Sequence, residues 1–339
     1  MFTEDFDFIL PNDLIAREPV MPRDSCRLMV LDKSRQHIAD KVFYDLESII
    51  REGDVLVFND SRVIPARLIL SYKERDVEVF LHKRLNDTDW LAMVRPGKFF
   101  VPGFVLPVYD GLEIEVVSVC DDGQRIMRFS DGRDKQNKAL ESIGRVPFPP
   151  YIKSTNATSD DYQTVFAQDE GSVAAPTAGL HFTDELLNKL KNKGVLFEFV
   201  TLHIGLGTFM PIKAHNIEEH IMHSENYYLD EGTASRLSVA KKAGRRIVAV
   251  GTTSVRVLED SFDSMNGFVP GERETNIFIY PGYAWKAVDS LITNFHLPKS
   301  SLMLLTCAFG GTDFIMRAYN EAIGKKYRFY SFGDAMMIF

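Results

Sequence analysis

Apolar and polar positions divide the chain into two kinds of segment. Between about residues 66 and 147 they alternate, as in Asp76–Leu81 and Leu112–Val116, which is typical of strands with one buried face. Turns are supplied by the Asp-Gly pairs that begin at Asp110, Asp122 and Asp131. No convincing helix interrupts this run. It therefore predicts an inserted domain of short antiparallel strands, packed as a small barrel or sandwich.

Strands and helices alternate on both sides of this insert, which predicts an α/β domain made of residues 1–65 and 148–339. Ile247–Val250 is a continuous apolar run of the kind buried in parallel sheets. Thr183 can cap a helix that runs through Lys191, and Gly194 can end it. Further expected elements are the strands Leu196–Ile204, Asn276–Tyr280 and Leu291–Phe295 and the helices Gly232–Ala243, Ser300–Phe309 and Phe314–Ile323. The predicted fold class is α/β, a discontinuous α/β domain with an inserted antiparallel β-barrel domain at residues 66–147.

The composition of the chain indicates its size class and its cellular compartment. The 339 residues, 45% hydrophobic and 25% charged, suit a globular chain of about two domains. The acidic start lacks the features of an export signal, and no stretch is long enough to span a bilayer. The cysteines are three and far apart, which disfavours a disulfide framework and structural zinc. We expect a cytoplasmic protein with no membrane partner, and a monomer because no coiled coil or obvious apolar edge strand is evident.

A net charge of −8 argues against a broad surface for nucleic acid, which is usually basic. Any RNA contact must then be local. The candidates are short basic clusters within residues 125–138, 241–246 and 325–328. For each cluster, a solvated surface is the simpler interpretation.

Standard nucleotide motifs are absent. Gly205–Met210 lacks the third glycine of the dinucleotide fingerprint, and neither a P-loop nor a Gly-x-Ser-x-Gly elbow occurs. The small residues of Gly171–Thr183 instead run straight into a helix start, where free N–H groups can bind a carboxylate or phosphate, although a close-packed turn is the alternative. Gly251–Arg256 has the same strand-to-helix placement. Two such loops predict a crevice between them.

Histidines gather in the second half of the chain. They are His181, His203, His215, His220, His223 and His296. Such a group predicts an acid or base, since histidine exchanges protons near neutral pH, although any single one can be structural. His220 and His223 could also share a helix face and bind a metal, but no His-Glu-x-x-His pattern supports this.

Taken together, these segments resemble the S-adenosylmethionine:tRNA ribosyltransferase-isomerase family of queuosine biosynthesis, over nearly the whole chain. The segments that carry the resemblance are Gly53–Arg67, Arg95–Lys98, Gly171–Thr183, Thr201–Phe209, His223–Glu225, Ala249–Arg256, Leu291–Ser300 and Tyr327–Met336. The chain departs from the family at Lys73–Asp76, where many members carry a Thr-Gly-Gly turn in a longer insert. The resemblance implies an α/β domain interrupted by a β-barrel, in agreement with the pattern above.

The resemblance also implies a reaction. The ribosyl moiety of S-adenosylmethionine would be transferred to the aminomethyl-deazaguanine at the wobble position of tRNA and isomerised, giving epoxyqueuosine-tRNA with release of adenine and methionine. The partners are thus tRNA carrying the precursor base and S-adenosylmethionine, which is a substrate. No cofactor or metal is expected, because the sulfonium is its own electron sink and leaving group.

This chemistry needs a base for a ribose C–H and an acid for adenine. The expected catalytic residues are His181, His203, His223, Glu225 and His296. The expected substrate-binding residues are Asp60, Arg62, Thr177, Gly179, Thr252, Thr253, Ser254, Arg256 and Asn294. A structural ion pair is the alternative for Asp60 and Arg62. Two rival functions remain, an ordinary S-adenosylmethionine-dependent methyltransferase and a noncatalytic RNA-binding module.

Overall fold

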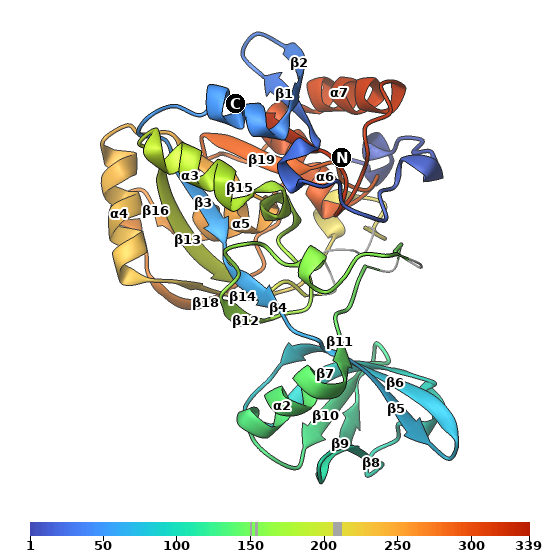
Figure 1. The fold of residues 1–339 in the computed structure, drawn as a ribbon. Coiled ribbons are helices and arrows are strands. Elements are labelled where there is room, and N and C mark those ends of the chain that lie inside the picture. Colours follow the sequence, from blue (N-terminus) through green and yellow to red (C-terminus); the bar gives the residue numbers. More distant parts are fainter. Residues whose placement is uncertain (150, 153–154, 206–211) are drawn as a thin grey trace. The chain divides into compact units, whose positions relative to one another are not determined.

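The chain forms two compact units (Figure 1), seen in a computed structural model that describes all residues except 150, 153–154 and 206–211. The first unit consists of Met1–Ser61, Tyr151–Asp169 and Ala175–Phe339, and the second of Arg62–Pro150 and Glu170–Ala174. The predicted fold class is confirmed. The chain is mixed α/β, with a nine-stranded mixed sheet and an inserted antiparallel sheet shaped as a half-barrel.

The nine-stranded sheet of the first unit has the order β18-β14-β13-β3-β15-β19-β20-β1-β2. Its four central parallel strands are β13 (Leu196–Leu202), β3 (Val55–Asn59), β15 (Ile247–Val250) and β19 (Ser290–Asn294). The outer strands are β1 (Arg27–Asp32), β2 (His37–Val42), β14 (Glu225–Leu229), β18 (Gly271–Thr275) and β20 (Ala335–Ile338). Because parallel strands end at the same edge, the residues that follow them are brought together there.

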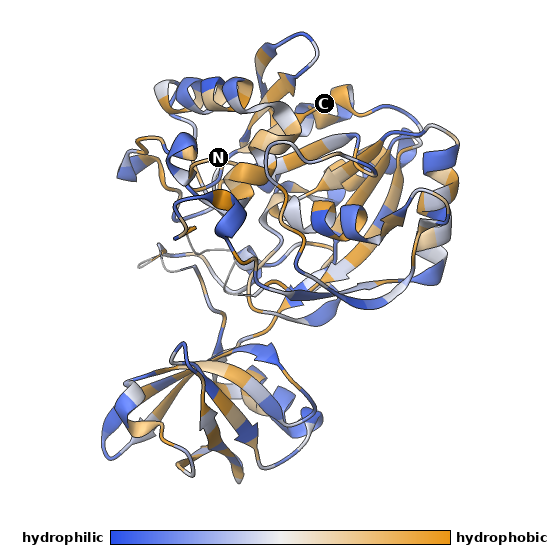
Figure 2. Cartoon of the chain, turned by 180° about the vertical axis from the view of Figure 1, so that it is seen from behind, coloured by the Kyte–Doolittle hydropathy of each residue, from blue (hydrophilic) through white to orange (hydrophobic). Residues whose placement is uncertain are grey.

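Burial explains why the central strands read as apolar runs. Every residue of β3, β15 and β19 is buried, and Figure 2 shows the sheet as the most apolar part of this unit. The helices of the unit are α1 (Leu46–Ile49), α3 (Asp184–Asn192), α4 (Glu231–Lys242), α5 (Thr252–Ser261), α6 (Ser301–Gly310) and α7 (Thr312–Gly324). Its short 3-10 helices are η1 (Thr3–Phe6), η2 (Asn12–Leu14), η3 (Arg23–Ser25), η4 (Phe43–Asp45), η6 (Asp160–Tyr162), η7 (Thr177–His181) and η9 (Ile217–Glu219). None of the described helices is long and apolar enough to cross a membrane.

Most elements expected in this unit are present. The Thr183 hydroxyl accepts a hydrogen bond from Leu186 N (3.2 Å) and caps α3 as predicted. The strand predicted at Asn276–Tyr280 is wrong, because β18 pairs with β14 only up to Thr275. There Ile277 N donates to the Thr275 hydroxyl (3.2 Å) instead of to a neighbouring strand. A side chain thus replaces the sheet partner and ends the strand.

The second unit is built on a seven-stranded antiparallel sheet with the order β11-β5-β6-β7-β10-β9-β8. Its strands are β5 (Arg67–Tyr72), β6 (Arg75–Arg84), β7 (Asp89–Arg95), β8 (Val105–Tyr109), β9 (Leu112–Val119), β10 (Arg125–Phe129) and β11 (Gly144–Arg145), with η5 (Gly97–Phe99) between β7 and β8.

Two small strand pairs lie outside these two sheets. They are β4 (Ser61–Val63) with β12 (Asp169–Ser172) and β16 (Phe262–Asp263) with β17 (Gly267–Phe268).

One helix in the insert was not expected. It is α2 (Arg133–Ile143), whose few buried residues include Gln136. The Gln136 amide oxygen accepts hydrogen bonds from Trp90 Nε1 and from Arg84 Nη1, both at 3.0 Å. The expectation of an all-strand insert is therefore wrong. Polar contacts across the sheet, which leave no apolar stripe in the sequence, hold this helix.

Candidate functional site

A pocket opens at the carboxyl edge of the central parallel strands. The residues that line it are Ala175, Pro176, Thr177, Ala178, Ile204, Gly251, Thr252, Thr253, Thr293, Asn294, His296 and Leu302. They belong to the segment of η7, to the ends of three parallel strands and to the starts of α5 and α6. The two small-residue loops singled out in the sequence thus lie on one pocket. In open α/β sheets this edge is where ligands bind.

One titratable ring lines this pocket. His296 is 8% exposed, and its Nε2 lies 2.8 Å from the Thr293 hydroxyl. No described residue forms a hydrogen bond with its Nδ1. Burial lowers the pKa of His296 to about 3, so the ring is neutral near pH 7. Of the five predicted acid and base residues, only His296 is among the described lining residues.

The N-terminus of α5 forms another side of the pocket. Gly251 has a φ of 89°, which favours glycine, and it turns the chain from β15 into the helix. The first N–H groups of a helix have no partner within it, so they are available to a ligand at this end. The Thr252 and Thr253 side chains lie beside them. Ser254 differs, because its buried hydroxyl donates to Val250 O (2.8 Å) and is therefore used within the protein.

Asn294 and Thr177 form the opposite wall. The Thr177 hydroxyl donates to Asn294 Oδ1 (2.9 Å), and Asn294 Nδ2 donates to His181 Nε2 (3.0 Å). His181 is fully buried behind these two residues and is not itself among the described lining residues. Burial and the positive charges of Arg23 and Arg328 lower its pKa to about 3. Its side chain is joined to the pocket lining by the hydrogen bond with Asn294.

Comparison with known proteins covers the chain from end to end. The sequence pattern of the queuosine biosynthesis protein family matches residues 3–338. The chain is 48% identical over 342 residues to an S-adenosylmethionine:tRNA ribosyltransferase-isomerase of Clostridium kluyveri, and 49% identical over 341 residues to one of Symbiobacterium thermophilum. Both alignments cover 100% of each chain. The chain belongs to the queuosine biosynthesis protein family.

A solved structure of a similar protein agrees with this assignment. The crystal structure of an S-adenosylmethionine tRNA ribosyltransferase from Thermotoga maritima is 38% identical in sequence. The match covers 99% of this chain and 100% of that chain, with a TM-score of 0.56. The queuosine biosynthesis family therefore accounts for both units.

Glu225 and Arg256 form a buried ion pair in this family member. Their side chains are 5% and 4% exposed, and Arg256 Nη1 contacts Glu225 Oε2. Glu225 Oε1 also accepts a hydrogen bond from Gly205 N (3.1 Å), and Arg256 Nη2 donates to Thr275 O (3.2 Å). Both charges are thus used inside the protein. The pair holds Gly205, which directly follows the lining residue Ile204.

Asp60 and Arg62 do not form the ion pair considered as an alternative. Asp60 is buried, and its Oδ1 accepts a hydrogen bond from the Thr201 hydroxyl (2.7 Å), which also lies 3.2 Å from Asp169 Oδ2. Burial raises the pKa of Asp60. Arg62, about half exposed in the second unit, lies 4.0 Å from Glu170.

The other predicted residues lie outside the described pocket lining. His203 follows β13 and is partly buried, and burial lowers its pKa. His223 is exposed. A Cβ on Gly179 would lie 2.8 Å from Phe166 and 2.9 Å from Thr164, so this glycine serves packing. The predicted motif Thr201–Phe209 extends past Gly205 into residues outside the described part of the chain.

The suggested metal pair gains no support from the fold. His220 and His223 follow η9 in an irregular segment, so they share no helix face, and His220 packs against Phe278 with ring centroids 5.1 Å apart. Across the described residues, no group of three or more His, Cys, Asp or Glu side chains is placed to hold a metal.

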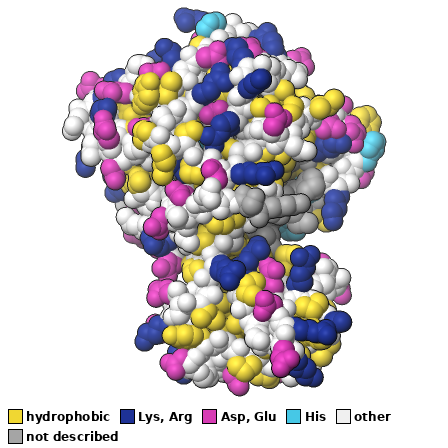
Figure 3. Space-filling view, turned by 45° about the vertical axis from the view of Figure 1, so that its right-hand side comes forward, with side chains coloured by type: hydrophobic (Ala, Val, Ile, Leu, Met, Phe, Trp, Pro, Cys, Tyr) yellow, Lys and Arg dark blue, Asp and Glu magenta, His cyan; other side chains and the backbone are white. Residues whose placement is uncertain are grey.

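Half of the basic side chains in the clusters suggested for RNA are paired with carboxylates of the chain. Lys325 Nζ lies 2.5 Å from both Asp40 and Glu321. The other pairs are Lys241 with Asp289, Arg246 with Asp54, Arg128 with Asp89, Arg133 with Asp87 and Lys135 with Asp131. Figure 3 shows basic and acidic side chains interspersed over the face drawn. Six of the twelve basic side chains in these clusters are therefore paired with carboxylates.

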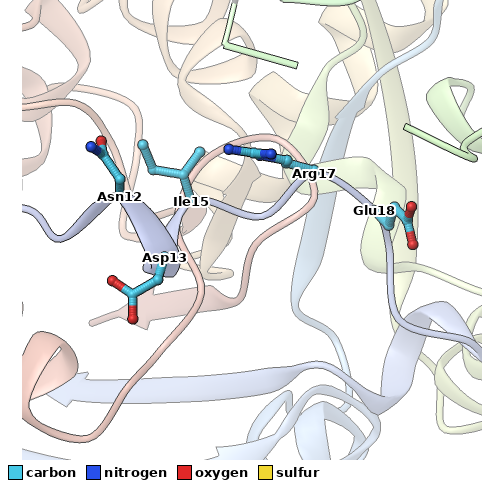
Figure 4. Close-up of a pocket in the computed structure, with 5 residues that line it drawn as sticks. All are labelled: Asn12, Asp13, Ile15, Arg17 and Glu18. Atoms are coloured by element: carbon cyan, nitrogen blue, oxygen red, sulfur yellow. The ribbon is translucent and has the colours of Figure 1, made fainter. Parts of the chain in front are cut away.

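A second hollow lies on the surface of the first unit, along the segment of η2 (Figure 4). Its lining residues are Asn12, Asp13, Ile15, Arg17 and Glu18. Their side chains spread along the segment rather than converging on one point. Glu18 Oε1 already accepts a hydrogen bond from Asn156 Nδ2 (2.8 Å). This hollow lacks the convergent polar groups of the pocket at the sheet edge.

Sequence reasoning missed Asn59, the last residue of β3. Its Nδ2 donates to Leu202 O (3.0 Å) and to the Thr253 hydroxyl (3.3 Å), and its Oδ1 accepts from Leu202 N (3.0 Å). It thus joins two strand ends to the start of α5. The available signal in the sequence was an amide side chain directly after the apolar run Val55–Phe58. The structure buries this amide. A buried polar side chain needs partners, and here these partners build the pocket edge.

Proposed function

We propose that this chain transfers the ribosyl moiety of S-adenosylmethionine onto the aminomethyl-deazaguanine at the wobble position of tRNA and isomerises it to epoxyqueuosine, as an S-adenosylmethionine:tRNA ribosyltransferase-isomerase. Adenine and methionine leave. The observation that carries this proposal is the pocket at the sheet edge, with a helix N-terminus on one side and a neutral histidine among its lining residues. It lies in a chain that matches such enzymes over its full length.

Each part of the pocket has a use in this reaction. The α5 N-terminus with Thr252 and Thr253 suits the carboxylate of the methionine portion, because free N–H groups and the helix dipole favour an anion. The positive sulfur acidifies the adjacent ribose C–H, and the presence of neutral His296 among the lining residues supports it as the base that takes this proton. Methionine then leaves as a neutral thioether, and its sulfur takes the electron pair of the broken C–S bond as a new bond forms at that carbon.

The RNA side of the proposal follows from charge. An acidic chain in which half of the side chains in the basic clusters are paired with carboxylates is poorly suited to a long phosphate groove. Unpaired bases of an anticodon loop are read by stacking and by contacts to base edges. The target base would be turned out of the loop into the pocket.

Product analysis tests this proposal against both rival functions. The protein is incubated with S-adenosylmethionine and tRNA that carries the precursor base, and the small molecules are separated. We expect adenine and methionine in equal amounts. S-adenosylhomocysteine instead would indicate a methyltransferase, and tRNA binding without any turnover would indicate a noncatalytic module.

His296→Gln tests the assignment of the base within this reaction. We expect kcat to fall by about 10²–10⁴-fold, the usual contribution of general acid–base catalysis, while S-adenosylmethionine still binds. The control is His37→Gln at an exposed position on β2, which should keep the wild-type kcat. A His296→Gln enzyme with wild-type kcat would remove His296 from the mechanism and leave the overall function to the product analysis.

A further inference from the structure

Behind one wall of the pocket, a row of hydrogen bonds joins four side chains. Cys26 Sγ lies 3.1 Å from His181 Nδ1, and His181 Nε2 lies 3.0 Å from Asn294 Nδ2. Asn294 Oδ1 then accepts from the Thr177 hydroxyl at 2.9 Å. Cys26 and His181 are buried, and Asn294 and Thr177 line the pocket.

The orientation of the Asn294 carboxamide is fixed by a backbone group. Its Nδ2 lies 3.2 Å from Tyr330 O, a carbonyl that can only accept. A flipped amide would place two acceptors face to face there. Nδ2 therefore donates one hydrogen to Tyr330 O and the other to His181 Nε2. Asn294 has no donor left for a ligand.

This orientation also fixes the proton on His181. Since Nε2 accepts from Asn294, the single proton of the neutral ring is on Nδ1 and points at Cys26 Sγ. Burial keeps both groups uncharged, because it lowers the pKa of His181 to about 3 and raises the pKa of the Cys26 thiol. Both ring nitrogens are thus occupied, and neither faces the pocket.

On the pocket side, only acceptors remain. Asn294 can offer Oδ1 alone, and the Thr177 proton is already donated to that oxygen. The lone pairs of two oxygens are therefore what this wall presents. A buried acceptor left without a donor costs free energy, so the wall favours a ligand group that carries one.

We infer that His181 is a positioning residue, and that the wall of Asn294 and Thr177 selects a hydrogen-bond donor on the nucleoside. This inference rests on the proposed function. On the nucleoside part of S-adenosylmethionine the available donors are the two ribose hydroxyls and the adenine amino group. A pocket of this kind rejects an analogue that lacks the donor, because the free lone pairs that the analogue shields from water then have no partner.

Binding measurements with matched analogues test the wall. The analogues lack the 2′-hydroxyl, lack the 3′-hydroxyl, or carry a dimethylated adenine amino group. We expect the wild type to bind at least one of them about tenfold or more weakly than S-adenosylmethionine. In Thr177→Val, which loses the hydroxyl, the ratio of the dissociation constants of the analogue and of S-adenosylmethionine should fall toward one. Thr177→Ser should keep the wild-type ratio. The analogue whose preference disappears identifies the donor.

Two substitutions at His181 separate positioning from proton transfer. His181→Gln can still accept from Asn294, so we expect it to retain far more of kcat and of affinity than His181→Phe. The pH profile of kcat for His181→Gln should keep both limbs. Long-range ¹H–¹⁵N spectra of the wild type should show one proton, on Nδ1, from pH 5 to 8, and this reading does not depend on how well any variant folds.

The results distinguish this inference from the proposed function. A wild type that neither binds nor consumes S-adenosylmethionine overturns the proposed function and the inference with it. An active wild type whose preference among the analogues is the same in Thr177→Val overturns the selective wall alone. A His181 ring that titrates near neutral pH, or a His181→Gln enzyme that loses a limb of the profile, overturns the positioning role.

Discussion

Glu225 and Arg256 show how burial decides the role of a residue. The sequence predicts Glu225 as a catalytic group and Arg256 as an anion binder, and both are among the segments that carry the family resemblance. In the structure they are almost fully buried and paired with each other. Two charges removed from water stabilise each other only as a pair, because a buried charge without its partner is costly. Their placement favours a structural role beside the pocket.

Breaking this pair should destabilise the fold. We expect Glu225→Gln to lower the free energy of unfolding by about 3–5 kcal/mol, because Arg256 would keep an uncompensated buried charge. The matched control is Glu198→Gln, whose partner Arg236 is 60% exposed and can be solvated, so its loss should be about 1 kcal/mol or less. Urea unfolding of the three proteins measures both values. If Glu225→Gln unfolds like the wild type and loses only kcat, Glu225 acts in catalysis instead.

At the residue scale, the sequence predicted the pocket better than the roles within it. Thr177, Thr252, Thr253, Asn294 and His296 were all expected at the site, and all line the pocket. The role of His181 was not accessible, because its partner Asn294 lies 113 positions away in the sequence. A residue type and a motif indicate that a histidine matters. Only its burial and contacts indicate whether it can exchange a proton.

At the element scale, two hairpins of the same sheet use different residues for the same turn. Lys73 and Glu74 connect β5 to β6 with φ angles of 48° and 59°, and Asp110 and Gly111 connect β8 to β9 with φ angles of 45° and 73°. Such two-residue turns require positive φ at both positions and favour Asn-Gly or Asp-Gly. The turn at Lys73 and Glu74 is therefore a strained version of a short hairpin.

Relieving this strain should stabilise the second unit. The double substitution Lys73→Asn with Glu74→Gly is expected to raise the free energy of unfolding by about 1 kcal/mol, since side chains other than glycine are disfavoured at positive φ. Gly111→Lys in the other hairpin is the converse control and should destabilise by a similar amount. Thermal unfolding of both variants measures the effect. A double variant with an unchanged or lower Tm would contradict this account of the turn.

Element prediction worked where burial leaves a pattern in the sequence. The apolar run Ile247–Val250 and the capped helix after Thr183 are both present, because a buried strand and a helix cap require particular residue types. Helix α2 escaped prediction because its buried Gln136 is held by hydrogen bonds rather than by an apolar stripe. The end of β18 at Thr275 was not predicted, because a side-chain hydrogen bond at Thr275 stops the strand.

At the scale of the whole molecule, two buried histidines link stability to pH. His181 and His296 have an ordinary pKa of 6.5, which the fold lowers to about 3 in each. Between these values the unfolded chain binds a proton on each ring and the folded chain does not. Lowering the pH through 6.5 therefore favours unfolding. Above pH 6.5 both states are neutral and the two rings contribute no pH dependence.

The size of this effect can be measured. At pH 5 each ring should lower the free energy of unfolding by about 2 kcal/mol relative to pH 7.5, since one pH unit corresponds to about 1.4 kcal/mol for each proton. His296→Gln should therefore reduce the loss of stability between pH 7.5 and pH 5 by about 2 kcal/mol. His37→Gln, at an exposed position, is the matched control and should leave the loss unchanged. Equal pH dependence in all three proteins would contradict the buried, neutral state of His296.

The central claim is that S-adenosylmethionine binds in the pocket where the central strands end. Photo-crosslinking with an azidoadenine analogue of S-adenosylmethionine, followed by peptide mapping of the full chain, tests it most directly. We predict labelled peptides from residues 175–181, 251–256 or 293–302, with labelling suppressed by excess S-adenosylmethionine. Specific labelling confined to the hollow at residues 12–18, or to the strands of the second unit, would contradict the claim.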